Sequence, residues 1–570
     1  MGRRQKVYSD PYGRRQKTEV LQWNGSVWSV YSTAVTAYDG LDRVTSVREY
    51  QGTEQSGVYQ ESASTYDGYG RLKSTHAPEQ EAGRSTTYSY NGDDTLASVT
   101  DARGVKAVYG YDRRHLVTSV AYDLSGVIAG QNVVDTPGVT FAYDAAGNRL
   151  WMDDGPGRVD YAYDALSRLL MESRQFDGLS GARTLAYEYT AAGALKSLTE
   201  QGVQTISYQH DNAGRLTQVT GTPYAGNVGT YASDFQYRAW GALKSFAYGH
   251  GPRQTRGYDS SMRLSSFEVA GATPQGPPVA LRAAYQYHAD GRVKYLDEML
   301  DADDRFDRSY DYDQAGRLKQ SLTAAGARAF AGLPTGGGAV GPYAQTYSYD
   351  VWGNLTGRSG KHWSQDQNFT ATYTNGQRQG WTYDAAGHVI ADDSLYARAS
   401  VFDAAGRKVQ AGEHQRSGGA RTTLIVNDLT LTQGYDGDGR TARREERSVR
   451  SLNNGAPQTT VETTYYVRSS VLGGAVVAEF DGQGQRQKGY VYAGGERVAK
   501  QWAGYLYWQY EEPVGGSSRE GSTQGYLYGG ATELDPLGED VGAADPYTDD
   551  TSAGYVGDYE TAGNGFDQSG

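Results

Sequence analysis

A ten-residue word recurs along the chain, and this repetition restricts the possible folds more than any other feature of the sequence. Residues 141–150 read FAYDAAGNRL, and close variants read YAYDALSRLL, YDYDQAGRLK, YSYDVWGNLT and WTYDAAGHVI. A fixed core at a variable interval predicts constant structural units joined by connections of changing length. About seventeen copies begin at a tyrosine or its substitute: Tyr8, Tyr38, Tyr66, Tyr90, Tyr111, Tyr143, Tyr163, Tyr189, His210, Tyr237, Tyr258, Tyr287, Tyr312, Tyr349, Tyr383, Phe402 and Tyr435.

Each copy has the pattern of one β-hairpin. An aromatic residue often lies two positions before the repeat tyrosine, as Phe141 does before Tyr143, and residues two apart on a strand share a face. The next residues, Asp-x-x-Gly, are typical of a turn, because the Asp side chain accepts hydrogen bonds from following amides and Gly adopts a positive φ. An outgoing strand then opens on Arg-Leu or a similar pair. The clearest predicted turn residues are Asp144, Gly147, Asp313, Gly316, Asp384, Gly387, Asp403 and Gly406.

The alternative to a structural role for these aspartates is a carboxylate site or a calcium loop. The best candidates are the stretch that begins at Asp436 and the acidic run DADDRFD at residues 301–307. A calcium loop counted from Asp436 or Asp301 puts Arg447 or Tyr312 at its twelfth position, where a bidentate Glu belongs. The turn interpretation is therefore favoured, and we predict no metal or other cofactor.

Composition favours a thin wall over a conventional apolar core. Only 38% of the 570 residues are hydrophobic, whereas the chain contains 48 Tyr and 75 Gly. Tyrosine covers apolar area while its hydroxyl keeps a polar partner, which suits a sheet that is wetted on one side. Lone hairpins are marginally stable, but hairpins in series pair each other's edges. A propeller blade needs four strands in about 40–45 residues, so we predict an all-β fold, a long antiparallel strip of hairpins in an open spiral.

Charge, cysteine content and hydropathy argue against several functional classes. A net charge of −13 without a clustered basic face argues against nucleic-acid binding. The absence of Cys excludes disulfides and Cys-ligated metals. No targeting segment occurs near the N-terminus, and no run approaches the roughly 20 apolar residues of a membrane span. The most apolar stretch, VLGGAVVAEF at 471–480, is expected to form a buried strand or a strand pair.

The Tyr-Asp-x-x-Gly-Arg-Leu cores resemble the YD repeats of the RHS-repeat proteins, a group that includes bacterial polymorphic toxins, shell components of insecticidal toxin complexes and the teneurins. The resemblance extends from Tyr8 to about Gln509, and the passage 468–501 is similar to the stretch that precedes the core segment of bacterial members. It implies that the strip spirals into a hollow shell or cocoon over residues 1–510. It also implies a C-terminal effector or toxin polypeptide as the partner held by the shell.

The C-terminal end departs from the family pattern. Residues 511–538 are expected to end the repeat region, with Asp535-Pro536-Leu537-Gly538 as a plain turn, because Glu539 stands where the family's cleavage motif has an apolar residue. Residues 539–570 contain many Asp and Gly residues and no Lys or Arg, so we expect a disordered acidic tail. The chain opens on a degenerate copy of the repeat, which we interpret as a sign of a fragment.

A search for catalytic groups finds no convergent set. The eight histidines are scattered, and neither a metal-spaced His pair nor a nucleophile elbow occurs. Several of these histidines, such as His210, replace repeat residues. The tryptophans suggest binding instead, since exposed aromatic rings suit the faces of sugars. Trp240 and Trp352 lie within turns and are candidate glycan-stacking residues, although a turn Trp more often packs on the neighbouring hairpin.

Two functions from different classes follow. The first is a non-enzymatic shell of an exported or surface-located bacterial protein, which encloses or presents a C-terminal effector that this sequence lacks. The second is a cell-surface adhesion module that binds a glycan or a partner protein through the same sheet. An enzyme is disfavoured, and we expect neither a nucleic-acid partner nor a membrane span.

Overall fold

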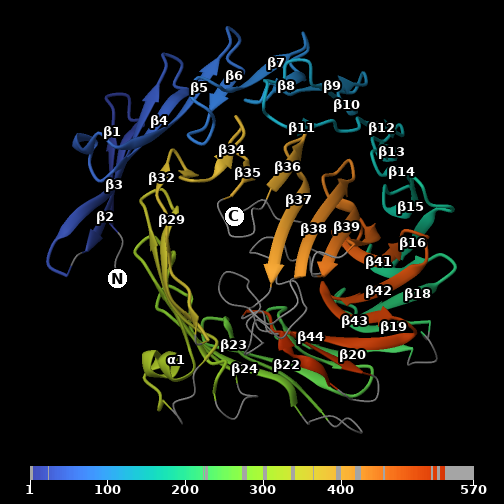
Figure 1. Cartoon of the computed structure of the whole chain (residues 1–570). Helices are drawn as coiled ribbons and strands as arrows, with labels where there is room; N and C mark the ends of the chain where they lie inside the picture. The colour runs from blue at the N-terminus through green and yellow to red at the C-terminus, as the bar shows by residue number, and fades with distance from the viewer. Residues whose placement is uncertain are drawn as a thin grey trace.

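The computed structural model confirms the predicted all-β fold (Figure 1). It describes residues 4–23, 25–222, 224, 229–271, 279–298, 304–335, 341–363, 365–392, 399–417, 425–452, 456–514, 518–522 and 527–532. The predicted boundary at residue 538, the turn at 535–538 and the acidic tail at 539–570 lie outside these residues, as do residues 301–303 of the acidic run.

The strands among the described residues form two large sheets, one of 30 strands and one of 14, and a short two-stranded ladder. The first sheet contains β1 (Arg4–Ser9), β2 (Arg15–Trp23), β3 (Trp28–Tyr38), β4 (Val44–Gln51), β5 (Tyr59–Tyr66), β6 (Leu72–His76), β7 (Thr86–Tyr90), β8 (Leu96–Thr100), β9 (Lys106–Tyr111), β10 (Val117–Asp123), β12 (Val139–Tyr143), β13 (Arg149–Asp154), β14 (Gly157–Tyr163), β15 (Leu169–Phe176), β16 (Arg183–Tyr189), β17 (Leu195–Glu200), β18 (Gln204–His210), β19 (Leu216–Gly221), β20 (Thr230–Tyr237), β21 (Leu243–Tyr248), β22 (Arg253–Tyr258), β23 (Leu264–Ala270), β24 (Val279–Tyr287), β25 (Val293–Glu298), β26 (Arg308–Tyr312), β27 (Leu318–Thr323), β28 (Tyr343–Tyr349), β29 (Leu355–His362), β30 (Gln365–Asp366) and β31 (Phe369–Thr370).

The second sheet contains β11 and the described strands from β34 onward. Its members are β11 (Val133–Val134), β34 (Thr382–Tyr383), β35 (Val389–Ala391), β36 (Ala399–Asp403), β37 (Lys408–Ser417), β38 (Ile425–Tyr435), β39 (Thr441–Leu452), β40 (Gln458–Ser469), β41 (Ala475–Asp481), β42 (Arg486–Ala493), β43 (Glu496–Trp502), β44 (Tyr505–Glu511), β45 (Ser518–Ser522) and β46 (Leu527–Thr532). The ladder between the two sheets pairs β32 (Tyr373–Thr374) with β33 (Gln377–Arg378).

Within each sheet the strands follow one another as a meander, and the repeat word explains the curvature. Strand β12 pairs with β13, β13 with β14 and β14 with β15, all antiparallel. The ladder shifts register directly before the repeat tyrosine, at Tyr143, Tyr163 and Tyr189. Such a bulge bends the strand and increases its twist. Because the bulge recurs from hairpin to hairpin, the strip curves and does not extend as a flat ribbon.

The strip winds past its own beginning. We call β1–β31 the first winding, β34–β46 the second winding, and the line of contact between overlapping parts of the strip the seam. In Figure 1 the first winding traces a ring, and the second crosses the space that the ring encircles. Sequence separation across the seam falls from 319 to 227 residues, so the second winding uses fewer residues per circuit and the spiral narrows. Representative seam pairs are Tyr31 with Asp350, Arg103 with Asp403, Glu172 with Ser470, and Tyr285 with Glu512.

The largest hydrophobic core lies in the seam. One face of β40 packs Tyr465 against Phe176 of the first winding, with ring centroids 5.0 Å apart. Trp508 of β44 lies against Tyr231 at 6.3 Å and against Tyr248 at 6.1 Å. The same cluster contains residues from both windings. Two overlapping sheets therefore bury their apolar faces against each other, and this double layer takes the place of a globular core.

Two features were not predicted from the repeat. The long interval between Tyr312 and Tyr349 contains a helix, α1 (Ala324–Ala331), which ends at Gly332 with a φ of 79°. The connection between β10 and β12 contributes β11, which pairs in parallel with β36 of the second winding. Neither feature belongs to a hairpin, so the repeat word carries no signal for either. Among the described residues, no helix is long and apolar enough to cross a bilayer.

Candidate functional site: the turn interlock and the inner face

The repeat aspartates organise their turns in the same way. At Asp313, one carboxylate oxygen accepts hydrogen bonds from the backbone N–H groups of Ala315 at 2.8 Å and Arg317 at 2.9 Å. The other oxygen accepts from Arg317 Nε at 2.8 Å. Gly316 closes the turn with a φ of 90°. The other predicted turns share this arrangement, with Asn148, His388 and Arg407 in place of Arg317, at Asp144/Gly147, Asp384/Gly387 and Asp403/Gly406.

Hydrogen bonding lowers the pKa of the carboxyl group in two of the repeat turns. At Asp144, the side-chain hydrogen bond from Asn148 is the main cause that lowers the pKa below its ordinary value of 3.8. At Asp164, the backbone N–H of Arg168 is the first cause of a lowered pKa. The structure thus gives each of these aspartates a hydrogen-bonding role within its own hairpin.

A second set of contacts locks each hairpin to the one before it. The Tyr189 hydroxyl donates to the backbone carbonyl of Leu169 at 2.7 Å, and the Arg168 guanidinium lies over the Tyr189 ring at 5.0 Å. Asp164 holds that Arg168 side chain at 2.6 Å. The Tyr, Asp and Arg of the repeat word therefore each take part in this set of contacts, which we call the interlock. The same tyrosine-to-carbonyl bond occurs from Tyr38, Tyr66, Tyr90, Tyr111, Tyr143, Tyr237, Tyr258, Tyr287, Tyr373 and Tyr435.

The interlock predicts that removing one tyrosine hydroxyl lowers the stability of the fold. Tyr189→Phe keeps the ring beneath Arg168 but leaves the Leu169 carbonyl without its donor, so we expect the free energy of unfolding to fall by about 0.5–1.5 kcal/mol. The matched control is Tyr12→Phe, because the Tyr12 side chain is 82% exposed. Denaturant titration followed by circular dichroism measures both variants. Equal losses of stability in the two variants would show that the tyrosine-to-carbonyl bond does not stabilise the fold.

The turn glycines allow a second prediction. Gly147 has a φ of 91°, so Gly147→Val should destabilise the fold by about 1–3 kcal/mol through backbone strain. Gly68 lies in a comparable turn without a positive φ, and a Cβ added there would meet no atom within 4 Å. Gly68→Val is therefore the control and should have little effect. Thermal unfolding distinguishes the two. An unchanged midpoint for Gly147→Val would contradict the turn assignment.

A buried carboxylate joins the two windings at the seam. Glu172 of β15 accepts hydrogen bonds from the backbone N–H of Ser470 at 2.8 Å and from its hydroxyl at 2.6 Å. The Tyr187 hydroxyl also donates to Glu172, and it contacts Ser469 Oγ at 2.8 Å. Glu172 is only 6% exposed, and burial raises its pKa above the ordinary value of 4.5 although Ser470 and Tyr187 oppose the shift.

This raised pKa predicts a pH-dependent stability. The contribution of protonated Glu172 is fully present below pH 4.5 and is lost as the pH rises through the higher folded-state pKa. Glu172→Gln keeps a neutral side chain at every pH, so the variant should gain stability relative to the parent as the pH rises from 4.5 to neutrality. The control is Glu188→Gln, because Glu188 is exposed and Lys196 lowers its pKa. A stability difference that stays constant with pH for Glu172→Gln would contradict the burial argument.

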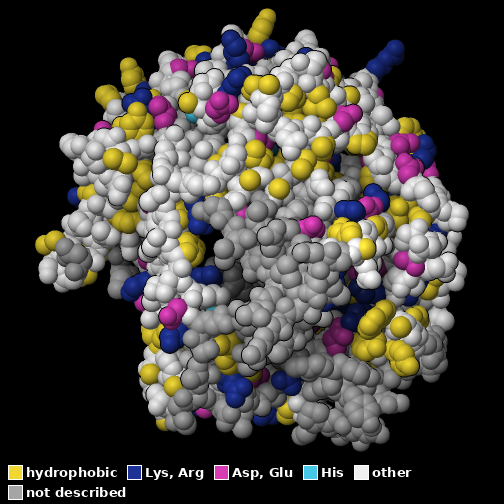
Figure 2. Space-filling model, viewed as in Figure 1, with side chains coloured by type: hydrophobic (Ala, Val, Ile, Leu, Met, Phe, Trp, Pro, Cys, Tyr) yellow, Lys and Arg dark blue, Asp and Glu magenta, His cyan; other side chains and the backbone are white. Residues whose placement is uncertain are grey.

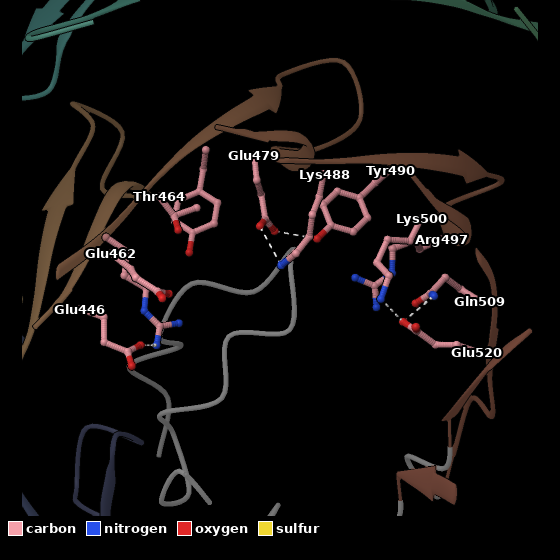
Figure 3. Close-up of a pocket in the computed structure, with 12 residues that line it drawn as sticks. Glu446, Glu462, Thr464, Glu479, Lys488, Tyr490, Arg497, Lys500, Gln509 and Glu520 are labelled. Atoms are coloured by element: carbon pink, nitrogen blue, oxygen red, sulfur yellow. Dashed lines mark hydrogen bonds and ion pairs between the residues drawn. The ribbon is translucent and has the colours of Figure 1, made fainter. Parts of the chain in front are cut away.

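The face of the second winding that points away from the first is polar and charged. In β40, Tyr465 faces the first winding, whereas Glu462, Thr464 and Tyr466 alternate with it and line a depression of about 300 Å³. Figure 3 shows the labelled side chains of this depression pointing from neighbouring strands into one shared space. We call this surface the inner face; its residues are Arg444, Glu446, Glu462, Thr464, Tyr466, Glu479, Lys488, Tyr490, Arg497, Lys500, Gln509 and Glu520.

Most charges of the inner face are paired with one another. Lys488 contacts Glu479 at 3.0 Å, and Tyr490 donates to the same carboxylate at 2.6 Å. Gln509 donates to Glu520 at 2.9 Å, and Lys500 pairs with it as well. The inner face therefore contains paired charges of both signs beside the rings of Tyr466 and Tyr490. On the face of the molecule in Figure 2, basic and acidic side chains are likewise interspersed.

The two turn tryptophans have different surroundings. Trp352 donates its indole N–H to the backbone carbonyl of Glu49 at 3.0 Å, so it docks a turn near the end of the first winding onto strand β4 at its beginning. Trp240 is 50% exposed and meets Tyr258 edge to face at 5.8 Å. The structure does not bring the two together into one platform. Glycan stacking at Trp240 and Trp352 stays a prediction.

Two of the histidines have structural roles in the repeat and in the seam. His388 Nδ1 contacts Asp384 at 2.8 Å in the place of the usual arginine, and its ring stacks on Phe402 at 4.6 Å. His250 stacks on Trp508 at 4.5 Å, and burial lowers its pKa to about 3. In the part of the chain that the structure describes, no three His, Asp or Glu residues are grouped as ligands of a metal ion.

Comparison with known proteins supports the resemblance to YD-repeat shells. A family model described as the teneurin YD-shell matches residues 5–180. The crystal structure of TcdB2-TccC3 superposes with a TM-score of 0.63 at 16% identity, over 94% of this chain and 31% of that chain. The chain therefore has the fold of that structure, and its first third matches the YD-shell model. The chain is equally similar to TcdB2-TccC3 without its hypervariable C-terminal region, with a TM-score of 0.63, 16% identity, and 94% and 30% of the two chains covered.

Two further relatives define how far the similarity extends. The Tc holotoxin pore of Photorhabdus luminescens matches this chain with a TM-score of 0.61 and 16% identity, over 94% of this chain and 30% of that chain. The tRNA3(Ser)-specific nuclease WapA of Bacillus spizizenii is 24% identical over 188 residues, which are 31% of this chain and 7% of the nuclease. The chain thus spans less than a third of the length of the solved chains and a small part of the nuclease.

Proposed function

We propose that this YD-repeat shell is a non-enzymatic container that encloses or presents an effector polypeptide supplied at its C-terminal side. We further propose that it belongs to an exported or surface-located bacterial protein. The observation that carries the proposal is the two-faced second winding. Its apolar face is used against the first winding through contacts such as Phe176 with Tyr465, and its inner face is left polar.

The chemistry of the inner face supports a container over an adhesive surface. Adhesive protein interfaces concentrate aromatic anchors and exclude charges at their centre. The inner face instead holds paired charges such as Glu479 with Lys488. Paired charges stay hydrated and give no net attraction for either sign, which suits a wall that must release what it holds. The similarity to TcdB2-TccC3 structures with and without a hypervariable C-terminal region agrees with this role.

Enclosure can be tested with single cysteines, because the chain has none of its own. Glu462→Cys puts a thiol on the inner face, and Glu188→Cys puts one on the opposite side of the wall, where Glu188 is 64% exposed in its side chain. A small maleimide should label both thiols at similar rates. A bulky poly(ethylene glycol) maleimide should label the inner-face thiol much more slowly than the outer one. Equal rates with the bulky reagent would reject enclosure.

A further inference from the structure

The connection from Leu124 to Gly138, between β10 and β12, differs from the other connections of the first winding. Most neighbouring hairpins are joined by short turns such as that between Asp154 and Gly157. Connections of the length of 124–138 are uncommon in compact folds and usually have a function. We call this segment the strap.

The strap crosses the seam and contacts the second winding at three successive points. Gln131 Oε1 accepts a hydrogen bond from the backbone N–H of Ala385 at 2.6 Å. Val133 and Val134 form β11, which pairs in parallel with Phe402 and Asp403 of β36. Thr136 is 6% exposed, and its hydroxyl accepts from the backbone N–H of Ala404 at 2.8 Å. All three contacts hold the start of the second winding, at the turns that follow β34 and β36.

A buried arginine of the first winding, Arg103, contacts the same two turns of the second winding. Arg103 is 1% exposed, and its guanidinium donates to the backbone carbonyl of Asp403 at 3.1 Å. It also lies 3.7 Å from the buried carboxylate of Asp384. The N–H of Glu81 donates to the Ala385 carbonyl at 3.0 Å. The turns at 384–387 and 403–406 are therefore seated on first-winding residues by backbone and side-chain bonds together.

The wall needs this support because its ladder is interrupted here. Among the described strands, the first sheet ends at β31, and β32 pairs only with β33. Strand β34 then starts the second sheet, and β35 meets β36 at a single residue pair, Ala391 with Ala399. A ladder this short stabilises little. The start of the second winding thus depends on the strap more than on its strand neighbours.

We propose that the strap is a latch and that the interruption between β31 and β34 is the hinge at which the shell opens. Release of the strap frees β34–β37 from the first winding, while the aromatic seam from Phe176 to Trp508 keeps the rest of the double wall closed. The opening then exposes the inner face at one defined place. The part of this inference that concerns access to the interior rests on the proposed container function, whereas the latch itself does not.

The test compares two triple variants in the full chain. The latch variant is Gln131→Ala, Val134→Gly and Thr136→Val, which removes both side-chain acceptors and weakens the β11 strand. The control is Gln131→Glu, Val134→Thr and Thr136→Ser, which keeps each acceptor and a β-branched residue in β11. Thr136→Val alone serves as a milder variant if the triple variant does not fold. Hydrogen exchange measured by mass spectrometry gives the readout.

We expect the latch variant to speed exchange by about 10-fold in the peptides that contain Ala385 and Ala404, with no change in β14–β19, while the control behaves as the parent. Unchanged exchange at Ala385 and Ala404 would overturn the latch, as would equal acceleration across β14–β19.

The bulky maleimide then reports access to the interior. When Glu462→Cys is combined with the latch substitutions, its thiol should react faster than the same thiol in an otherwise unchanged shell. Fast labelling of that thiol already without the latch substitutions, together with the local exchange change, would reject the container and leave the latch standing.

Discussion

Trp508→Ala is expected to lower the free energy of unfolding by about 3–5 kcal/mol, because a large ring is removed from a fully buried site. Trp508 is 0% exposed and lies between His250, Tyr231 and Tyr248 of the first winding. These rings belong to the first winding and Trp508 to the second, so collapse around the cavity would require the windings to shift against each other. Denaturant titration followed by circular dichroism measures the loss.

The control for this prediction is Trp502→Ala on the neighbouring strand. Trp502 is 45% exposed, with Lys500 over its ring at 5.7 Å, so the same truncation should cost roughly 1 kcal/mol or less. The seam interpretation requires a large difference between the two variants. Similar losses at Trp508 and Trp502 would mean that the aromatic seam contributes little to the fold.

Arg174→Met should destabilise the shell by about 3–5 kcal/mol, because it leaves a buried carboxylate without its cation. Arg174 is 7% exposed and binds Asp154 through two hydrogen bonds of 2.9 and 2.5 Å. Asp154 also accepts the backbone N–H of Gly437 at 2.9 Å, so the pair supports a turn of the second winding. Thermal and chemical unfolding both report this loss.

A second substitution separates the lost ion pair from lost packing. Asp154→Asn in the Arg174→Met background removes the uncompensated charge and keeps an oxygen for Gly437, so at least half of the lost stability should return. A double-mutant cycle gives the coupling between the two residues. Losses that simply add in the double variant would contradict the argument from a buried charge.

The repeat word was enough to predict the hairpin, its turn and the strip. The spacing from Asp313 to Gly316 carries the turn in its own residues, since the partners of the carboxylate lie within four positions. The spacing of the hairpins favoured an open spiral over a propeller, and the resemblance to YD repeats added the hollow shell. Local hydrogen bonds are readable from sequence because the residues that make them are neighbours in it.

The interlock and the seam could not be predicted in the same way. Tyr189 bonds a backbone carbonyl, at Leu169, and any residue type provides one, so the sequence contains no sign of the pairing. Glu172 and Ser470 are 298 residues apart, and their contact depends on how much chain one circuit uses. The number of residues in one circuit is set by the curvature of many hairpins added together, and no single repeat word reveals it.

Trp352 shows how the two kinds of information differ. The sequence places it in a turn, where it could contact a sugar or pack on a neighbour. The structure gives its indole N–H a partner in Glu49, a residue 303 positions away on the first winding. The helix α1 is a similar case, because it lies in an interval without the repeat word. The roles of residues outside the repeat pattern depend on contacts that form only when the strip winds back on itself, so the sequence alone does not predict them.

A disulfide across the seam tests the two-winding shell most directly. In the cysteine-free chain, Thr136→Cys and Ala404→Cys introduce two thiols at positions 268 residues apart whose parent side chain and backbone share a hydrogen bond of 2.8 Å. Mild oxidation should close the disulfide within one molecule, seen as faster migration on a non-reducing gel, whereas Thr136→Cys with Ser260→Cys should stay open. If the first pair stays reduced or links only separate molecules, the strip does not wind back over itself and the account fails.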